Sequence, residues 1–127
     1  MKLLLDTQTL ILAGRDQLPK SATLAYKSNS NTVYFTLVSL WEIGIKSALG
    51  KLRFQRKISE YHELLVEELG LLPLAIEMLH IEKAVSLPFH HKDPFDRLII
   101  GQALVEGFTV LGSDGYFDSY GCKRIWD

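Results

Sequence analysis

The stretch HHKDPFDRLIIGQALVEGFTVL, residues 90–111, has the signals of a buried helix followed by a buried strand. Asp93 and Pro94 are residue types favoured at the N-cap and first position of a helix, and Gly107 is typical of the residue after one. The segment 94–106 is apolar on nearly every side, as in a helix enclosed by the core. The run 108–111 is short, apolar and β-branched, which indicates a strand.

The same alternation of strands and helices runs along the whole chain. Strands are predicted at 2–5, 33–37, 71–74, 108–111 and 124–126, and helices at 7–13, 21–28, 39–49, 59–69, 76–87 and 94–106. Several of these strands are continuous apolar runs, which is the pattern of a parallel sheet covered by helices on both faces. With 127 residues, no repeat and no linker, we expect a single α/β domain over residues 1–127.

Composition excludes several classes of protein. The net charge of −1 argues against a generally basic nucleic-acid-binding coat, although a local basic patch is compatible with it. The single cysteine, Cys122, cannot form an internal disulfide, which fits a reducing compartment and a cytoplasmic location. The opening MKLLLDT has too short an apolar stretch for a signal peptide, and no run approaches the roughly 18–20 apolar residues of a membrane span.

Four carboxylates are predicted to meet at one edge of this sheet. Strand C-termini and helix N-termini share an edge in a parallel α/β fold. Asp6 ends the first strand, and Glu42 lies in the first turn of the helix after the second strand. Asp96 lies in the first turn of helix 94–106, and Asp114 follows the next strand. Carboxylate oxygens suit Mg²⁺ or Mn²⁺, so the pattern predicts a divalent-cation site.

Each acid also has a purely structural explanation. Asp6 and Asp96 could stabilise helix N-termini, and Asp114 belongs to an Asp-Gly turn. Ser39 and Glu42 have the spacing of a capping box. These explanations need four separate causes, whereas one metal site accounts for all four acids.

A basic segment follows Glu42. No acid occurs from residue 43 to 59, and the bases there are Lys46, Lys51, Arg53, Arg56 and Lys57. This segment is either ordinary solvated surface or a patch that contacts phosphates beside the acidic site.

The histidines do not form a metal-binding motif. His90 and His91 are adjacent in a predicted loop and lack ligand spacing, so we interpret them first as solvated residues and second as substrate contacts. His62 and His80 are interpreted as structural.

Four stretches resemble the motifs of PIN-domain nucleases, most closely the VapC-like toxins of bacterial toxin–antitoxin pairs. They are LLLDT at 3–7, VSLWEIGIKSALGKL at 38–52, HHKDPFDRLIIGQA at 90–103 and VLGSDGYFDSYG at 110–121. By this resemblance the third acid is Asp96 and not Asp93. The family usually has Thr or Ser two residues before the fourth acid; this chain has Gly112, with Ser113 beside it.

The resemblance implies a three-layer α/β/α fold whose parallel sheet has the order 3-2-1-4-5. It implies a Mg²⁺- or Mn²⁺-dependent endoribonuclease that forms homodimers and binds an antitoxin. We expect RNA to enter as a single strand, because sequence-specific proteins mostly read unpaired bases. Expected metal and catalytic residues are Asp6, Glu42, Asp96 and Asp114; expected orienting residues are Thr7, Ser39 and Ser113; expected RNA contacts are Lys46, Arg53, Arg56, Lys57 and Arg97. The alternative is a PIN-fold module that binds RNA or protein without cleavage, an interpretation that Gly112 favours.

Overall fold

The computed structural model describes residues 1–127 and contains five strands and seven helices. The strands are β1 (Lys2–Leu5), β2 (Thr32–Thr36), β3 (Leu72–Leu74), β4 (Thr109–Leu111) and β5 (Lys123–Ile125). The helices are α1 (Thr7–Gly14), α2 (Lys20–Lys27), α3 (Leu37–Ala48), α4 (Ile58–Glu67), α5 (Met78–Ser86), α6 (Pro94–Glu106) and α7 (Tyr116–Ser119). No helix is both long enough and apolar enough to cross a membrane.

All five strands pair in parallel in the order β3-β2-β1-β4-β5, which confirms the predicted topology. The central strand β1 pairs with β2 on one side and β4 on the other, so that Leu5 lies between Phe35 and Leu111. The carboxyl ends of these three strands therefore meet at one edge. The segments that follow these three strands therefore start close together in space.

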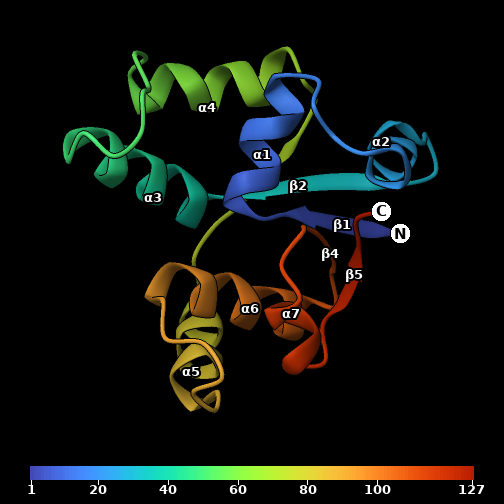
Figure 1. The fold of residues 1–127 in the computed structure, drawn as a ribbon, viewed down its shortest axis with the longest axis vertical. Helices are drawn as coiled ribbons and strands as arrows, with labels where there is room; N and C mark the ends of the chain where they lie inside the picture. The colour runs from blue at the N-terminus through green and yellow to red at the C-terminus, as the bar shows by residue number, and fades with distance from the viewer.

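Helices cover both faces of the sheet (Figure 1). Helices α1 to α4 lie on one face, and α5, α6 and α7 lie on the other. Successive strand residues point to opposite faces, so Leu4 packs in the core under α6 while Leu5 packs in the core under α1 and α3. This confirms the expected three layers and explains why the central strand is apolar from Leu3 to Leu5.

The start of α3 differs from its prediction. The helix begins at Leu37, where the Thr36 hydroxyl caps it by accepting the Val38 N–H at 3.1 Å. Ser39 and Glu42 therefore lie inside the helix, and the capping-box interpretation of this pair is wrong. Glu42 is free to turn its side chain toward the sheet edge.

Candidate metal centre

The four predicted acids line one cavity of about 380 Å³ at the carboxyl edge of the sheet. They come from four places in the fold: the ends of β1 and β4, the second turn of α3 and the first turn of α6. The other lining residues are Thr7, Gln8, Ile11, Ile43, Lys46, Lys51, Leu52 and Tyr116. The topology thus gathers carboxylates that are up to 108 residues apart in the chain (Asp6 to Asp114).

Asp6 caps helix α1 and also lines the acidic cavity. It is the N-cap of α1, because its Oδ1 accepts the Thr9 N–H at 2.8 Å, and only 4% of the residue is exposed. Burial raises the pKa of Asp6 to about 6; the hydrogen bond from the Thr9 N–H opposes this, and the charges of Asp96 and Asp114 add to it. The capping interpretation of Asp6 is confirmed, but it does not account for the crowding by other acids.

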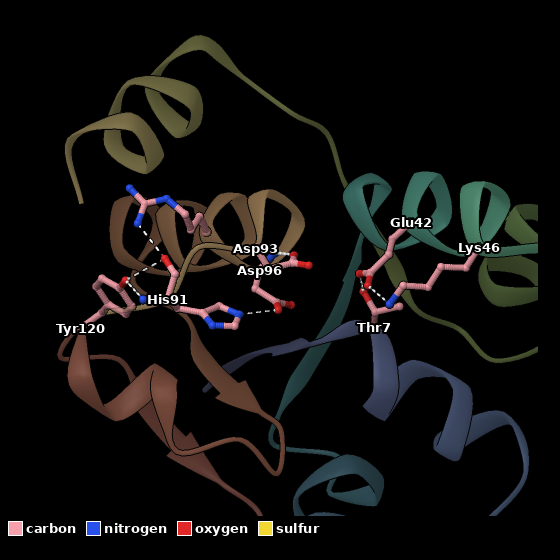
Figure 2. A network of polar contacts seen from close by, with 8 residues as sticks. Thr7, Glu42, Lys46, His91, Asp93, Asp96 and Tyr120 are labelled. Carbon is pink, nitrogen blue, oxygen red and sulfur yellow. Dashed lines mark hydrogen bonds and ion pairs between the residues drawn. The ribbon is translucent and has the colours of Figure 1, made fainter. Parts of the chain in front are cut away.

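Glu42 is buried, and two polar side chains bond directly to its carboxylate (Figure 2). The Thr7 hydroxyl lies 2.6 Å from Oε1, and the Lys46 ammonium lies 2.6 Å from Oε2. The Ser39 and Thr7 hydroxyl oxygens are 2.9 Å apart. Since the single Thr7 proton goes to the carboxylate, Ser39 is the donor to Thr7. Thr7 and Ser39 thus lie where they orient Glu42, and the ion pair with Lys46 is present.

Asp96 is half-buried on the opposite side of the cavity. Its backbone N–H donates to the Asp93 carboxylate at 2.9 Å, so Asp93 is the N-cap of α6 and Asp96 is not. Its Oδ2 lies 2.7 Å from Nε2 of His91 (Figure 2). Burial raises the pKa of Asp96, the hydrogen bond from His91 lowers it, and Asp93 and Glu42 add to the increase.

His91 was missed as a site residue when it was interpreted as a solvated loop residue. Its side chain is 29% exposed and contacts the third acid directly. The sequence offered no periodicity for this position, because the loop has no regular geometry that would place residue 91 against residue 96.

Asp114 is exposed at the rim of the cavity, two residues after Gly112. A Cβ atom at Gly112 would lie 2.7 Å from Oδ2 of Asp6, closer than real Cβ contacts come. Glycine therefore allows Asp6 to approach the end of β4. Ser113 is exposed and is not among the residues that line the cavity, whereas Tyr116 is. The expected role of Ser113 in orienting Asp114 therefore lacks support.

Arg97 does not lie at the surface, which corrects its interpretation as an RNA contact. The residue is 7% exposed, and its guanidinium donates to the carbonyl oxygens of Ala84, Leu87, Pro88 and His91 at 2.7–3.0 Å. Two of these carbonyls lie at the C-terminal end of α5, where carbonyl groups lack the usual i+4 partner: Ala84 is in its last turn and Leu87 is its C-cap residue. Arg97 caps α5 and holds the following loop.

The other predicted RNA contacts are split between two places. Lys46 lines the acidic cavity, as does Lys51, another lysine of the basic segment. Arg53, Arg56 and Lys57 are exposed between α3 and α4, and the two arginines border a separate shallow depression. The basic segment therefore begins at the cavity and ends on the neighbouring surface.

A second acid–histidine group, Glu77, His80 and Glu106, is a structural feature. Nδ1 of His80 accepts the Glu77 N–H at 3.0 Å, so the proton of the neutral ring is on Nε2, which lies 2.8 Å from the Glu106 carboxylate. Both ring nitrogens are occupied: the bond at Nδ1 caps α5, and the bond at Nε2 links α5 to Glu106 at the end of α6. The predicted structural role of His80 fits this arrangement.

The donor set of the acidic cavity fits a hard divalent cation. All four acids offer oxygen ligands for the cation. The Thr7 hydroxyl and the Lys46 ammonium donate hydrogen bonds to one of these ligands, Glu42. The raised pKa values of Asp6 and Asp96 have burial as their main cause and neighbouring carboxylates as a further one. A bound cation would offset both effects.

Comparison with known proteins identifies the family. The PIN-domain family model matches residues 3–121. A chain of VapBC2 from Rickettsia felis, bound to a DNA fragment from its promoter, has a similar fold with a TM-score of 0.70, 17% identity and 100% coverage of both chains. DNA-bound VapBC from Salmonella typhimurium has a TM-score of 0.68 and 19% identity, with coverage of 98% of this chain and 97% of the other. FitAcB from Neisseria gonorrhoeae has a TM-score of 0.62 and 19% identity, with coverage of 97% of this chain and 96% of the other.

No curated protein sequence matches the chain. Identities of 17–19% to the solved structures establish likeness of fold. The family match is a separate finding and spans nearly the whole chain. With the acidic cavity and the β3-β2-β1-β4-β5 sheet, it leads to one conclusion: this chain belongs to the PIN-domain family.

Proposed function

We propose that the protein is a metal-dependent endoribonuclease that acts as the toxin of a toxin–antitoxin pair in the cytoplasm. The observation that carries this proposal is the convergence of Asp6, Glu42, Asp96 and Asp114 on one cavity. Buried carboxylates that repel each other are costly to keep without a cation, and a divalent ion compensates for that cost.

The residues of the cavity have distinct tasks in RNA hydrolysis. The four carboxylates would hold Mg²⁺ or Mn²⁺, which when bound supplies an activated water and stabilises negative charge on the phosphate. Thr7 and Ser39 orient Glu42. Lys46 neutralises part of the Glu42 charge, and Lys51 places a second positive charge at the cavity for the RNA backbone.

Protein partners are supported by the exposed surface of α5. Met78, Leu79 and Val85 are 61–74% exposed there, and Phe89, just after the helix, is 71% exposed. Apolar side chains gathered in this way are typical of protein–protein contacts. Together with the VapBC and FitAcB complexes among the similar structures, this favours a homodimer and an antitoxin partner.

The alternative is a module that binds RNA or protein without cleavage. Gly112 was its main support, because a hydroxyl usual in the family is missing. In this structure Gly112 makes room for Asp6, and all four carboxylates still line the cavity. The nuclease is therefore the better-supported function.

The deciding experiment is cleavage of single-stranded RNA by purified, antitoxin-free protein. We expect activity with Mg²⁺ or Mn²⁺, none in EDTA, and recovery when metal is added back. Because a metal-activated water attacks the phosphorus, products should carry 5′-phosphate and 3′-hydroxyl ends. Products with 2′,3′-cyclic phosphate would contradict the mechanism, and absence of cleavage with every metal would favour the binding module.

A further inference from the structure

The loop between α5 and α6 is fixed by two side chains that lie outside it. Arg97 donates to the carbonyl oxygens of Pro88 and His91 at 2.9 and 3.0 Å. The Tyr120 hydroxyl donates to the Pro88 carbonyl at 2.7 Å. It also accepts the His91 N–H at 2.8 Å (Figure 2). Both backbone polar groups of His91 are thus bonded, so this loop position has little freedom to move.

The His91 ring is also fixed. It stacks on the Tyr116 ring with centroids 4.1 Å apart and planes inclined by 23°, and Tyr116 in turn stacks on the buried Phe117. Its Nε2 lies 2.7 Å from Oδ2 of Asp96. An ionised carboxylate can only accept, so Nε2 carries the proton of this bond.

Asp96 depends on this bond more than Glu42 depends on any one partner. Glu42 has a hydroxyl on one oxygen and an ammonium on the other. The His91 imidazole makes the short hydrogen bond to Asp96, at 2.7 Å from Oδ2, and the Tyr116 hydroxyl also stabilises the ionised carboxylate. Without His91 the carboxylate would lose the shorter of these two contacts.

We propose that His91 is a positioning residue that fixes the Asp96 carboxylate for cation binding, held in place by Arg97, Tyr120 and the Tyr116 ring. The inference rests on the proposed function, because it assigns Asp96 to a cation. It also gives a role to the residues around Asp96 in HHKDPFDR: Asp93 and Pro94 start the helix, and Arg97 fixes the loop that carries His91. Partners of this kind, which orient a ligand from behind, are as characteristic of metal sites as the ligands themselves.

The test compares three variants of the full-length protein by calorimetric titration with Mn²⁺. His91→Phe keeps a ring for stacking and removes the donor, whereas His91→Gln replaces Nε2 with an amide N–H₂. His90→Phe is the matched control, because His90 is the exposed neighbour in the same loop. We expect His91→Phe to weaken Mn²⁺ binding by about 10- to 100-fold, His91→Gln to recover most of it, and His90→Phe to bind like wild type.

The melting temperature of each metal-free variant and a parallel titration of Asp96→Asn separate the possible failures. If Asp96→Asn loses affinity but His91→Phe does not, the positioning role is overturned while the proposed function stands. If both His91 variants lose affinity equally, the hydrogen bond is not the cause and the inference is also overturned. Wild-type protein that does not bind Mn²⁺, or Asp96→Asn that binds it normally, would overturn the proposed function and this inference with it.

Discussion

The two sides of the acidic cavity hold their carboxylates in different ways. On the α3 side, Glu42 is 4% exposed and bonded to Thr7 and Lys46, so its negative charge has a fixed positive partner. On the α6 side, Asp96 is more exposed and is bonded to an imidazole from a loop. Burial and nearby acids raise the pKa of Asp96. The α3 side is therefore neutralised by the protein itself, and the α6 side retains an uncompensated charge.

This difference predicts opposite effects on the metal-free protein when each acid loses its charge. Asp96→Asn should leave the free energy of unfolding unchanged or higher, because repulsion is relieved. Glu42→Gln should lower it by up to about 1 kcal/mol, because the half-exposed Lys46 loses its partner. Both variants should lose RNA cleavage by at least ~10²-fold, on the scale of removing a key electrostatic group. Urea unfolding in EDTA and a cleavage assay measure the two effects.

Asp93→Asn is the control for these variants. Asn is as good an N-cap as Asp, so stability and cleavage should both stay close to wild type. If Asp96→Asn were less stable than wild type and still cleaved RNA, Asp96 would be a structural acid and the four-carboxylate site would be wrong.

Asp6 sharpens the comparison through pH. Its pKa rises from 3.8 to about 6 on folding, so between these values the folded protein binds more protons than the unfolded chain. The metal-free protein should therefore lose stability as pH rises from about 4 to 6, by at most about 3 kcal/mol. Denaturant unfolding in EDTA across this range measures the slope. Asp6→Asn should flatten it, and an unchanged slope would place the titration elsewhere.

Thr7→Val tests how far the α3 side depends on its hydroxyl pair. The change keeps the shape of the side chain but removes the donor to Glu42 and the acceptor for Ser39, at a cost of about 1–3 kcal/mol. Thr9→Val, two residues along the same helix, is the matched control. The Thr9 hydroxyl is buried without a hydrogen-bond partner, so its loss should be neutral or slightly stabilising. Equal effects of the two changes on thermal unfolding would contradict a special role for Thr7.

The smallest effect is expected outside both sides of the cavity. Replacing Arg53, Arg56 and Lys57 with Gln should leave stability unchanged, since all three are exposed. Binding to single-stranded RNA should weaken, and its dependence on salt concentration should become flatter, because fewer counterions are released. Salt slopes equal to those of wild type for RNA and for an antitoxin would identify the segment as ordinary surface.

Regular periodicity made most of the fold predictable. The helix Pro94–Glu106 was predicted with its observed bounds, because Asp93, Pro94 and Gly107 are unambiguous end signals. The edge of the sheet that carries the four acids followed from the parallel topology alone. The short helix α7 was not predicted, since four residues give no periodic pattern.

Side chains that act across elements were not predictable. Arg97 and Asp96 are adjacent in sequence, but Arg97 donates to the last carbonyls of α5, which no local pattern reveals. Gly112 looked like a missing hydroxyl until the position of the Asp6 carboxylate was known. Both cases depend on the distance between elements that only the assembled fold defines.

The central position of β1 has a consequence for the order in which the protein is made. Leu3 pairs with Thr109, so β1 leaves the ribosome more than one hundred residues before β4, one of its two neighbours. A nascent chain that ends before β4 carries Asp6 and Glu42 without the strand that precedes Asp114. The complete acidic cavity therefore forms only after β4 and Asp114 have been translated, and fragments that end before β4 lack it.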